Sequence, residues 1–186
     1  CSPEDMFKVQ RDVLARYHVS DAQAFYSGQD FWIVPDDPTK PALKQAQPPY
    51  FLTLRMPDQA EPAFQLTTAY APSKRQTLAA FMAVNSDPGE DYGTIRVLQL
   101  PRNTTIPGPT QVQNNFESDP DVSAKLSLLR SGGSDVELGN LLSLPVGGGL
   151  LYFEPVYVRA SAGEGYPLLR KVLVRSEEHT SELQSR

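Results

Sequence analysis

Histidine and cysteine are the first residue types to weigh, because acid–base catalysis, nucleophilic catalysis and metal binding depend on them. The chain has two histidines, His18 and His179, and one cysteine, Cys1. His18 follows Tyr17 at the end of an expected helix, where the helix dipole favours histidine without any catalytic role. A catalytic histidine would also need a nucleophile, and the sequence has neither a Gly-x-Ser-x-Gly motif nor a cysteine partner for it. We therefore assign no catalytic residue.

Three carboxylates, Asp87, Glu90 and Asp91, lie within the polar segment 85–93. Oxygen ligands grouped in this way could hold Ca²⁺. The spacing departs from an EF-hand loop, because Leu98 stands where the bidentate glutamate belongs. We interpret the segment as a solvated turn and assign no metal ligand.

Two further motifs could contact a ligand. The glycines at 147–149 could approach a phosphate, but no Lys-Ser/Thr pair follows them and both flanks read as strands. The aromatic side chains of Phe25, Tyr26, Phe31 and Trp32 could stack on a ligand, yet their apolar neighbours favour a core. We predict a strand connection at the glycines, a core aromatic cluster and no bound cofactor.

The last twelve residues, 175–186, differ in kind from the rest. From Arg175 to Ser185 they resemble, letter for letter, the in-frame translation of a common short-read sequencing adaptor. Glu178, His179 and Glu182 would otherwise suggest a metal site by their spacing, although Leu183 stands where an inverted zinc motif needs its second histidine. We predict that 175–186 is a disordered, adaptor-derived artefact and that 1–174 belongs to a soluble domain.

The expected helices are short and begin at recognisable caps. The first runs from Pro3 to about Tyr17, and a second ends at Gly28. A third reaches Phe116, and Asp119 caps a fourth. The apolar positions of the first helix predict one buried stripe, with Lys8, Arg11, Asp12 and Arg16 pointing away from it: Met6, Val9, Val13 and Tyr17, flanked by Phe7 and Leu14.

Runs rich in β-branched and aromatic residues, bounded by turn residues, predict eight strands. They lie at Phe31–Val34, Tyr50–Arg55, Phe64–Tyr70, Leu78–Val84, Thr94–Leu100, Val136–Val146, Leu150–Val158 and Leu168–Val174. The second and third are expected to form a hairpin. By composition Leu78–Val84 could also be a helix, and we favour a buried strand. Because strands and helices do not alternate, we predict an α+β fold with a mainly antiparallel sheet rather than a dinucleotide-binding fold.

Composition limits the function classes. The 186 residues are 40% hydrophobic and carry a net charge of −5. Basic runs are no longer than pairs such as Lys74-Arg75, which argues against a nucleic-acid partner. The longest charge-free stretch, Leu138 to Phe153, is interrupted by Pro145 and the glycines, so it predicts no membrane-spanning helix.

Several strings resemble the UPF0182 family of uncharacterised multi-pass membrane proteins, best known from actinobacteria. They are Pro3–Arg11, Gln47–Tyr50, Leu78–Pro88, Val97–Pro101, Leu126–Gly133, Gly139–Tyr157 and Pro167–Val172. The resemblance implies a fragment of a larger extracytoplasmic domain at the cell membrane, with the membrane helices upstream of Cys1. It supplies no established site residues.

From the resemblance we expect a non-enzymatic role in envelope-associated binding or transport support, with an envelope protein or a glycan as partner. The alternative is an envelope hydrolase whose active site lies partly outside this sequence. Cys1 followed by Ser2 also leaves open the start of a mature bacterial lipoprotein.

Overall fold

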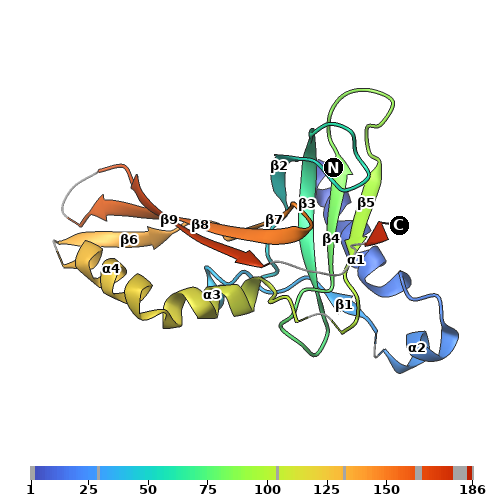
Figure 1. The fold of residues 1–186 in the computed structure, drawn as a ribbon, viewed down its shortest axis with the longest axis horizontal. Coiled ribbons are helices and arrows are strands. Elements are labelled where there is room, and N and C mark those ends of the chain that lie inside the picture. The colour runs from blue at the N-terminus through green and yellow to red at the C-terminus, as the bar shows by residue number, and fades with distance from the viewer. Residues whose placement is uncertain are drawn as a thin grey trace.

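The computed structural model describes residues 3–28, 30–103, 105–131, 133–161, 165–177 and 184–185. It confirms the predicted α+β fold with antiparallel sheets (Figure 1). The helical elements are α1 (Pro3–Tyr17), α2 (Ala22–Ser27), η1 (Pro41–Leu43), α3 (Pro109–Ser118) and α4 (Pro120–Arg130). The strands are β1 (Trp32–Ile33), β2 (Tyr50–Leu54), β3 (Ala63–Pro72), β4 (Ala80–Asn85), β5 (Ile95–Gln99), β6 (Ser134–Leu138), β7 (Leu142–Val146), β8 (Gly149–Ala160), β9 (Leu168–Glu177) and β10 (Gln184–Ser185). No helix in these ranges is long and apolar enough to cross a bilayer.

The first sheet is built around β3. β4 pairs with one side of β3, β5 pairs with β4, and β10 pairs with β5. β2 and β1 pair with different lengths of β3. Most side chains on both faces of the hairpin formed by β3 and β4 are buried, as expected for a sheet covered on both sides. The predicted hairpin of β2 and β3 and the predicted strands at β4 and β5 are confirmed.

The second sheet is built around the twelve-residue strand β8. β6 and β7 pair with successive lengths of β8, and β9 also pairs with β8. The sheet extends away from the first one, with α3 and α4 running along it (Figure 1). The single strand predicted for Val136–Val146 is instead divided into β6 and β7. The chain breaks at Gly139, where a Cβ atom would lie 2.5 Å from Cγ of Pro155, so only glycine fits this approach to β8.

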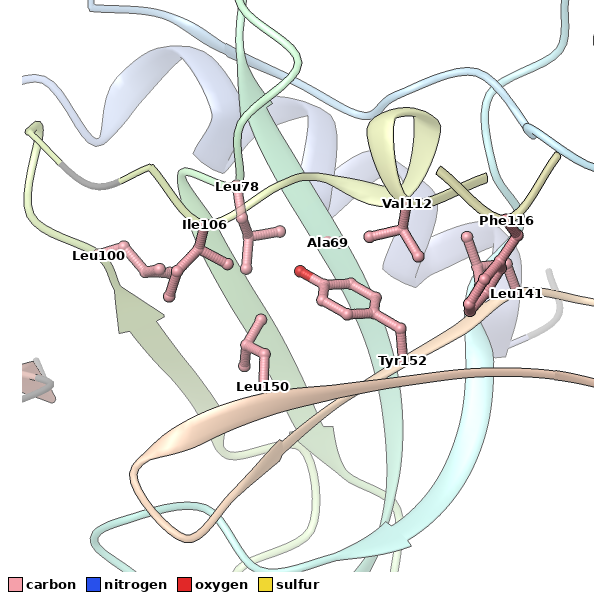
Figure 2. Packing of buried hydrophobic residues seen from close by; sticks show 9 residues of the cluster. All are labelled: Ala69, Leu78, Leu100, Ile106, Val112, Phe116, Leu141, Leu150 and Tyr152. Atoms are coloured by element: carbon pink, nitrogen blue, oxygen red, sulfur yellow. The ribbon is translucent and has the colours of Figure 1, made fainter. Parts of the chain in front are cut away.

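The main core joins the two sheets. Side chains from β3, β8, α3 and the intervening loops form one buried cluster (Figure 2). Its members are Ala69, Leu78, Leu100, Ile106, Val112, Phe116, Leu141, Leu150 and Tyr152. The hydroxyl of Tyr152 donates to the carbonyl of Pro107 at 2.6 Å. This bond satisfies the one polar atom that the tyrosine brings into the core.

Helix α1 has the predicted length but buries a different face. Met6, Val9, Val13 and Tyr17 are each at least half exposed, so the predicted buried stripe is wrong. The face packed on β3 and β4 instead carries Phe7, Arg11 and Ala15. Arg11 can be buried because its aliphatic stem packs against the sheet while its guanidinium donates to a backbone carbonyl.

Arg11 and Gln47 also connect distant parts of the chain. Nη1 of Arg11 donates to the carbonyl of Gln47 at 2.9 Å, and Nε2 of Gln47 donates to the carbonyl of Leu141 at 2.9 Å. The hydroxyl of Tyr70 donates to the carbonyl of Arg11 at 2.9 Å. These buried bonds tie α1 to β3 and to the start of β7.

The predicted aromatic core cluster is only partly correct. Of the aromatic cluster, Trp32 is buried, Phe25 and Phe31 are half-buried, and Tyr26 is 88% exposed at the tip of α2. Within the tail, 175–177 continue β9 and 184–185 form β10. The adaptor origin of 175–186 and the division at 174 stay predictions.

Candidate functional site

A cleft of about 410 Å³ lies where the turn between β3 and β4 meets the segment that follows β5. Its lining residues come from three segments that are far apart in the sequence. They are Asp30, Pro72, Lys74, Arg75, Thr77, Leu78, Ala79, Leu100, Pro101 and Arg102. Leu78, Ala79 and Leu100 are buried and form an apolar floor. The charged residues stand at the rim.

Backbone hydrogen bonds fix the walls of this cleft. Leu78 N–H donates to the carbonyl of Ile106 at 2.8 Å, and Leu100 N–H donates to that of Ala79 at 2.9 Å. Gly108 N–H donates to the carbonyl of Gln76 at 2.7 Å. A Cβ atom on Gly108 would lie only 2.7 Å from that same oxygen, so the turn that carries Lys74 requires glycine at position 108.

The rim of the cleft is positively charged. Lys74 and Arg75 are exposed, and Arg102 pairs with Asp30 at 3.0 Å between Nη2 and Oδ2. Three cations against one carboxylate leave a local excess of two positive charges on a chain whose net charge is −5. Lysine and arginine around an apolar floor suit a carboxylate or phosphate group on a larger ligand. The arrangement can therefore bind an anion.

His18 lies close to this region but packs against the core. Its ring stacks on Trp32 with centroids 3.5 Å apart, and its Nδ1 lies 3.0 Å from the carbonyl of Leu14. Burial lowers the pKa of His18 from its ordinary value of 6.5, opposed by hydrogen bonding to nearby carbonyls and by the charge of Asp30. These contacts give His18 a packing role.

The acidic segment 85–93 forms a turn, as predicted. Oδ2 of Asp87 accepts the Phe64 amide at 2.9 Å, and Oδ1 of Asn85 accepts the Asp87 amide at 2.8 Å. Asp87 thus holds the end of β4 against the start of β3. Across the described ranges, no group of three histidine, cysteine, aspartate or glutamate side chains could hold a metal ion.

The remaining sequence candidates fall in two places. Gly147 and Gly148 have φ angles of 58° and 81° and form the turn between β7 and β8, which confirms a strand connection. Glu178, His179 and Glu182 lie outside the described residues.

A buried carboxylate that the sequence reading missed lies on β8. Glu154 is fully buried, and neither of its carboxylate oxygens has a hydrogen-bond partner in the part of the chain that is described. Burial raises the pKa of Glu154 to about 7, with an opposing interaction from Gln113 and smaller contributions from the charges of Glu117 and Asp37. Glu154 is therefore protonated in the folded chain over much of the range below neutrality.

The alternation of side chains along β8 could have indicated that Glu154 is buried. It occupies the same face of β8 as Tyr152 and Val156, both of which are fully buried. The cleft offered a weaker signal, since Lys74-Arg75 is an ordinary basic pair and Arg102 is far from it in sequence. Only the pairing of β4 with β5 brings them together.

The described residues thus form an antiparallel α+β fold that carries a cationic cleft. Comparison with known proteins identifies the family of this chain. The model of the family described as "Uncharacterised protein family (UPF0182)" matches residues 2–129. The chain belongs to the UPF0182 family, which confirms the resemblance seen in its sequence.

Curated relatives extend the match and come mostly from actinobacteria. A UPF0182 protein of Streptomyces coelicolor is 56% identical over 173 residues, covering 92% of this chain and 17% of the relative. For Micrococcus luteus the identity is 53% over 186 residues, covering 92% and 18%, and for Kocuria rhizophila 50% over 186 residues, covering 92% and 19%. The chain spans less than a fifth of these relatives. No solved structure matches it.

Proposed function

We propose that this chain is part of an extracytoplasmic domain of a multi-pass bacterial membrane protein and that it contributes binding rather than chemistry. Its ligand is an anionic group on an envelope glycan, held in the cleft between Lys74, Arg75 and Arg102. Membership of the UPF0182 family supports the membrane context, because the resemblance to that family implies a multi-pass membrane protein.

The cationic cleft is the observation that carries the binding role. Its positive rim stands out on an acidic chain, and the buried residues beneath the rim give the cleft a packed floor. Lys74 and Arg75 are exposed and can reorient toward a ligand. Hydrogen bonds from such cations to anionic oxygens are about twice as strong as neutral ones.

Calorimetric titration of the chain with a poly(glycerol phosphate) oligomer tests the binding role. We expect the parent chain to bind this oligomer and not to bind the neutral sugar maltohexaose. The double variant Lys74→Ala/Arg75→Ala should bind the oligomer about tenfold or more weakly, because two charge-assisted contacts disappear. The matched control, Lys125→Ala/Arg130→Ala, removes the same two charge types from exposed positions on α4 and should bind as the parent does. Equal binding by all three proteins would contradict the proposal.

Two further outcomes bear on the rest of the proposal. Hydrolysis of the oligomer by the full-length protein, lost on changing Asp87 or Glu90, would support the hydrolase alternative. Placement of this segment outside the cell is tested by labelling an exposed position, Ser127→Cys, in intact cells with a membrane-impermeant maleimide. Labelling only after the membrane is permeabilised would contradict an extracytoplasmic position.

A further inference from the structure

The second sheet has one buried face and one open face. On β8 the buried side chains of Tyr152, Glu154 and Val156 point toward the core, so the residues between them point the other way. We call the open side the outer face. It is formed by Leu142 and Leu144 on β7, Leu151 and Phe153 on β8, and Val172 and Val174 on β9.

These six residues form a continuous apolar patch because the strand register aligns them. Leu142 pairs with Phe153, which pairs with Val174, so one row crosses three strands. Leu144 pairs with Leu151 in the neighbouring row. Val172 and Val174 are 48% and 59% exposed, and the other four are half-buried. None of the six belongs to the three buried clusters found in the described part of the chain.

Such a face is unusual for a sheet that ends at solvent. An antiparallel sheet with one wet face normally alternates apolar and polar residues along its strands, whereas β8 is apolar on both sides from Leu150 to Phe153. Within the described residues β9 also pairs only with β8, so its other edge is open. Large contiguous apolar patches on a surface mark places where protein, membrane or ligand makes contact.

The length of the relatives indicates what that element is. The chain spans 17% to 19% of the curated relatives given above, so more than four fifths of such a protein lies outside the matched stretch. We propose that the outer face is an internal domain contact, covered in the full-length protein by apolar side chains of the same polypeptide from outside this stretch. The proposal is independent of ligand binding at the cleft.

Photocrosslinking in a full-length protein tests the proposal. The Streptomyces coelicolor relative would carry residues 3–174 of this chain in place of its own matching stretch, with p-benzoylphenylalanine at Val174 or, as control, at Leu128. Leu128 is an apolar residue that is 73% exposed on α4. We expect Val174 to crosslink within one polypeptide to peptides outside the matched stretch. Crosslinks to a second copy, which double the mass on a denaturing gel, or to lipid alone would overturn the proposal.

Cysteine labelling gives a second, independent readout that does not depend on crosslinking yield. In the same full-length protein without other accessible cysteines, Val172→Cys should react with a maleimide about tenfold more slowly than Leu128→Cys, because a covered side chain reacts only after local opening. Equal rates at the two positions would show that the outer face is free and would overturn the proposal. Unfolded protein is recognised separately, because both cysteines would then react at the rate of a denatured sample.

Discussion

The two sheets of this chain differ in how completely they are covered. In the first sheet, Tyr70, Ala80 and Met82 face α1, while Phe81 and Ala83 face the other way, and all five are buried. In the second sheet, burial is confined to the face that meets α3 and the first sheet. The centre of the first sheet is thus covered on both faces, although Phe51 and Phe64 beside it are 41% and 42% exposed. The second sheet leaves one face open along three of its strands. The amino-acid sequence alone does not show which sheet is covered on both faces and which on one.

The largest expected effect compares one phenylalanine from each sheet. Phe81 is 1% exposed between packed layers, whereas Phe153 lies half-buried on the outer face. We expect Phe81→Ala to reduce the free energy of unfolding of the chain by about 3 to 5 kcal/mol, because it leaves a cavity that cannot collapse. Phe153→Ala should cost less, roughly 1 to 2 kcal/mol, because part of its ring stays in contact with water and no closed cavity is left behind. Urea unfolding measures both.

The difference between the two phenylalanine variants is the informative quantity. Similar losses for both would mean that the outer face is already packed within this chain. That result would remove the contrast between the sheets. In the full-length protein, the cost of Phe153→Ala should rise toward that of Phe81→Ala if the outer face is a domain contact.

The buried face of the second sheet can be probed through Glu154. Its pKa is raised to about 7 from an ordinary value of 4.5, so the folded chain holds a proton that the unfolded chain releases between these values. The contribution of Glu154 to the free energy of unfolding is therefore fully present below about pH 4.5 and is lost as the pH rises through about 7. At about 1.4 kcal/mol per unit, the difference in pKa corresponds to roughly 3 kcal/mol.

We accordingly expect Glu154→Gln to be more stable than the parent by up to about 3 kcal/mol at pH 8, and about equally stable at pH 4.5. Unfolding by urea across this pH range measures the effect, with the exposed Glu61→Gln as control. His18 gives the opposite slope, because its lowered pKa makes acid unfavourable to the folded state, but it is common to all three proteins. A parent and a Glu154→Gln variant with parallel pH profiles would contradict the raised pKa.

The elements of this fold could be predicted wherever a residue acts on its own neighbours in sequence. Asp119 was expected to cap α4, and its Oδ1 accepts the amides of Asp121 and Val122 at 2.9 Å and 3.0 Å. The hairpin of β2 and β3 was expected from residue types and the polar loop between them, and these two strands pair along their length. Local capping and β-propensity are short-range, so one sequence carries them.

Features that depend on contacts between distant residues could not be predicted from the sequence. The wrong face was chosen for α1 because burial of Arg11 depends on the carbonyl of Gln47, 36 residues away. The cleft depends on Arg102 reaching the turn that carries Lys74. The buried face of α1 and the cleft both depend on the register of the sheets, which cannot be predicted from the periodicity of a single segment.

The smallest expected effect tests the seam between the sheets through a single hydroxyl. Tyr152 is fully buried and donates to the carbonyl of Pro107, which precedes α3. Removing the hydroxyl leaves that carbonyl without this donor, so Tyr152→Phe should cost about 1 to 2 kcal/mol in urea unfolding. Tyr157→Phe, half-buried on the opposite side of the same strand, should change stability by less than about 0.5 kcal/mol. If the two tyrosine variants behaved alike, the polar bond at the seam would not stabilise it, and the joint between the sheets would rest on apolar packing alone.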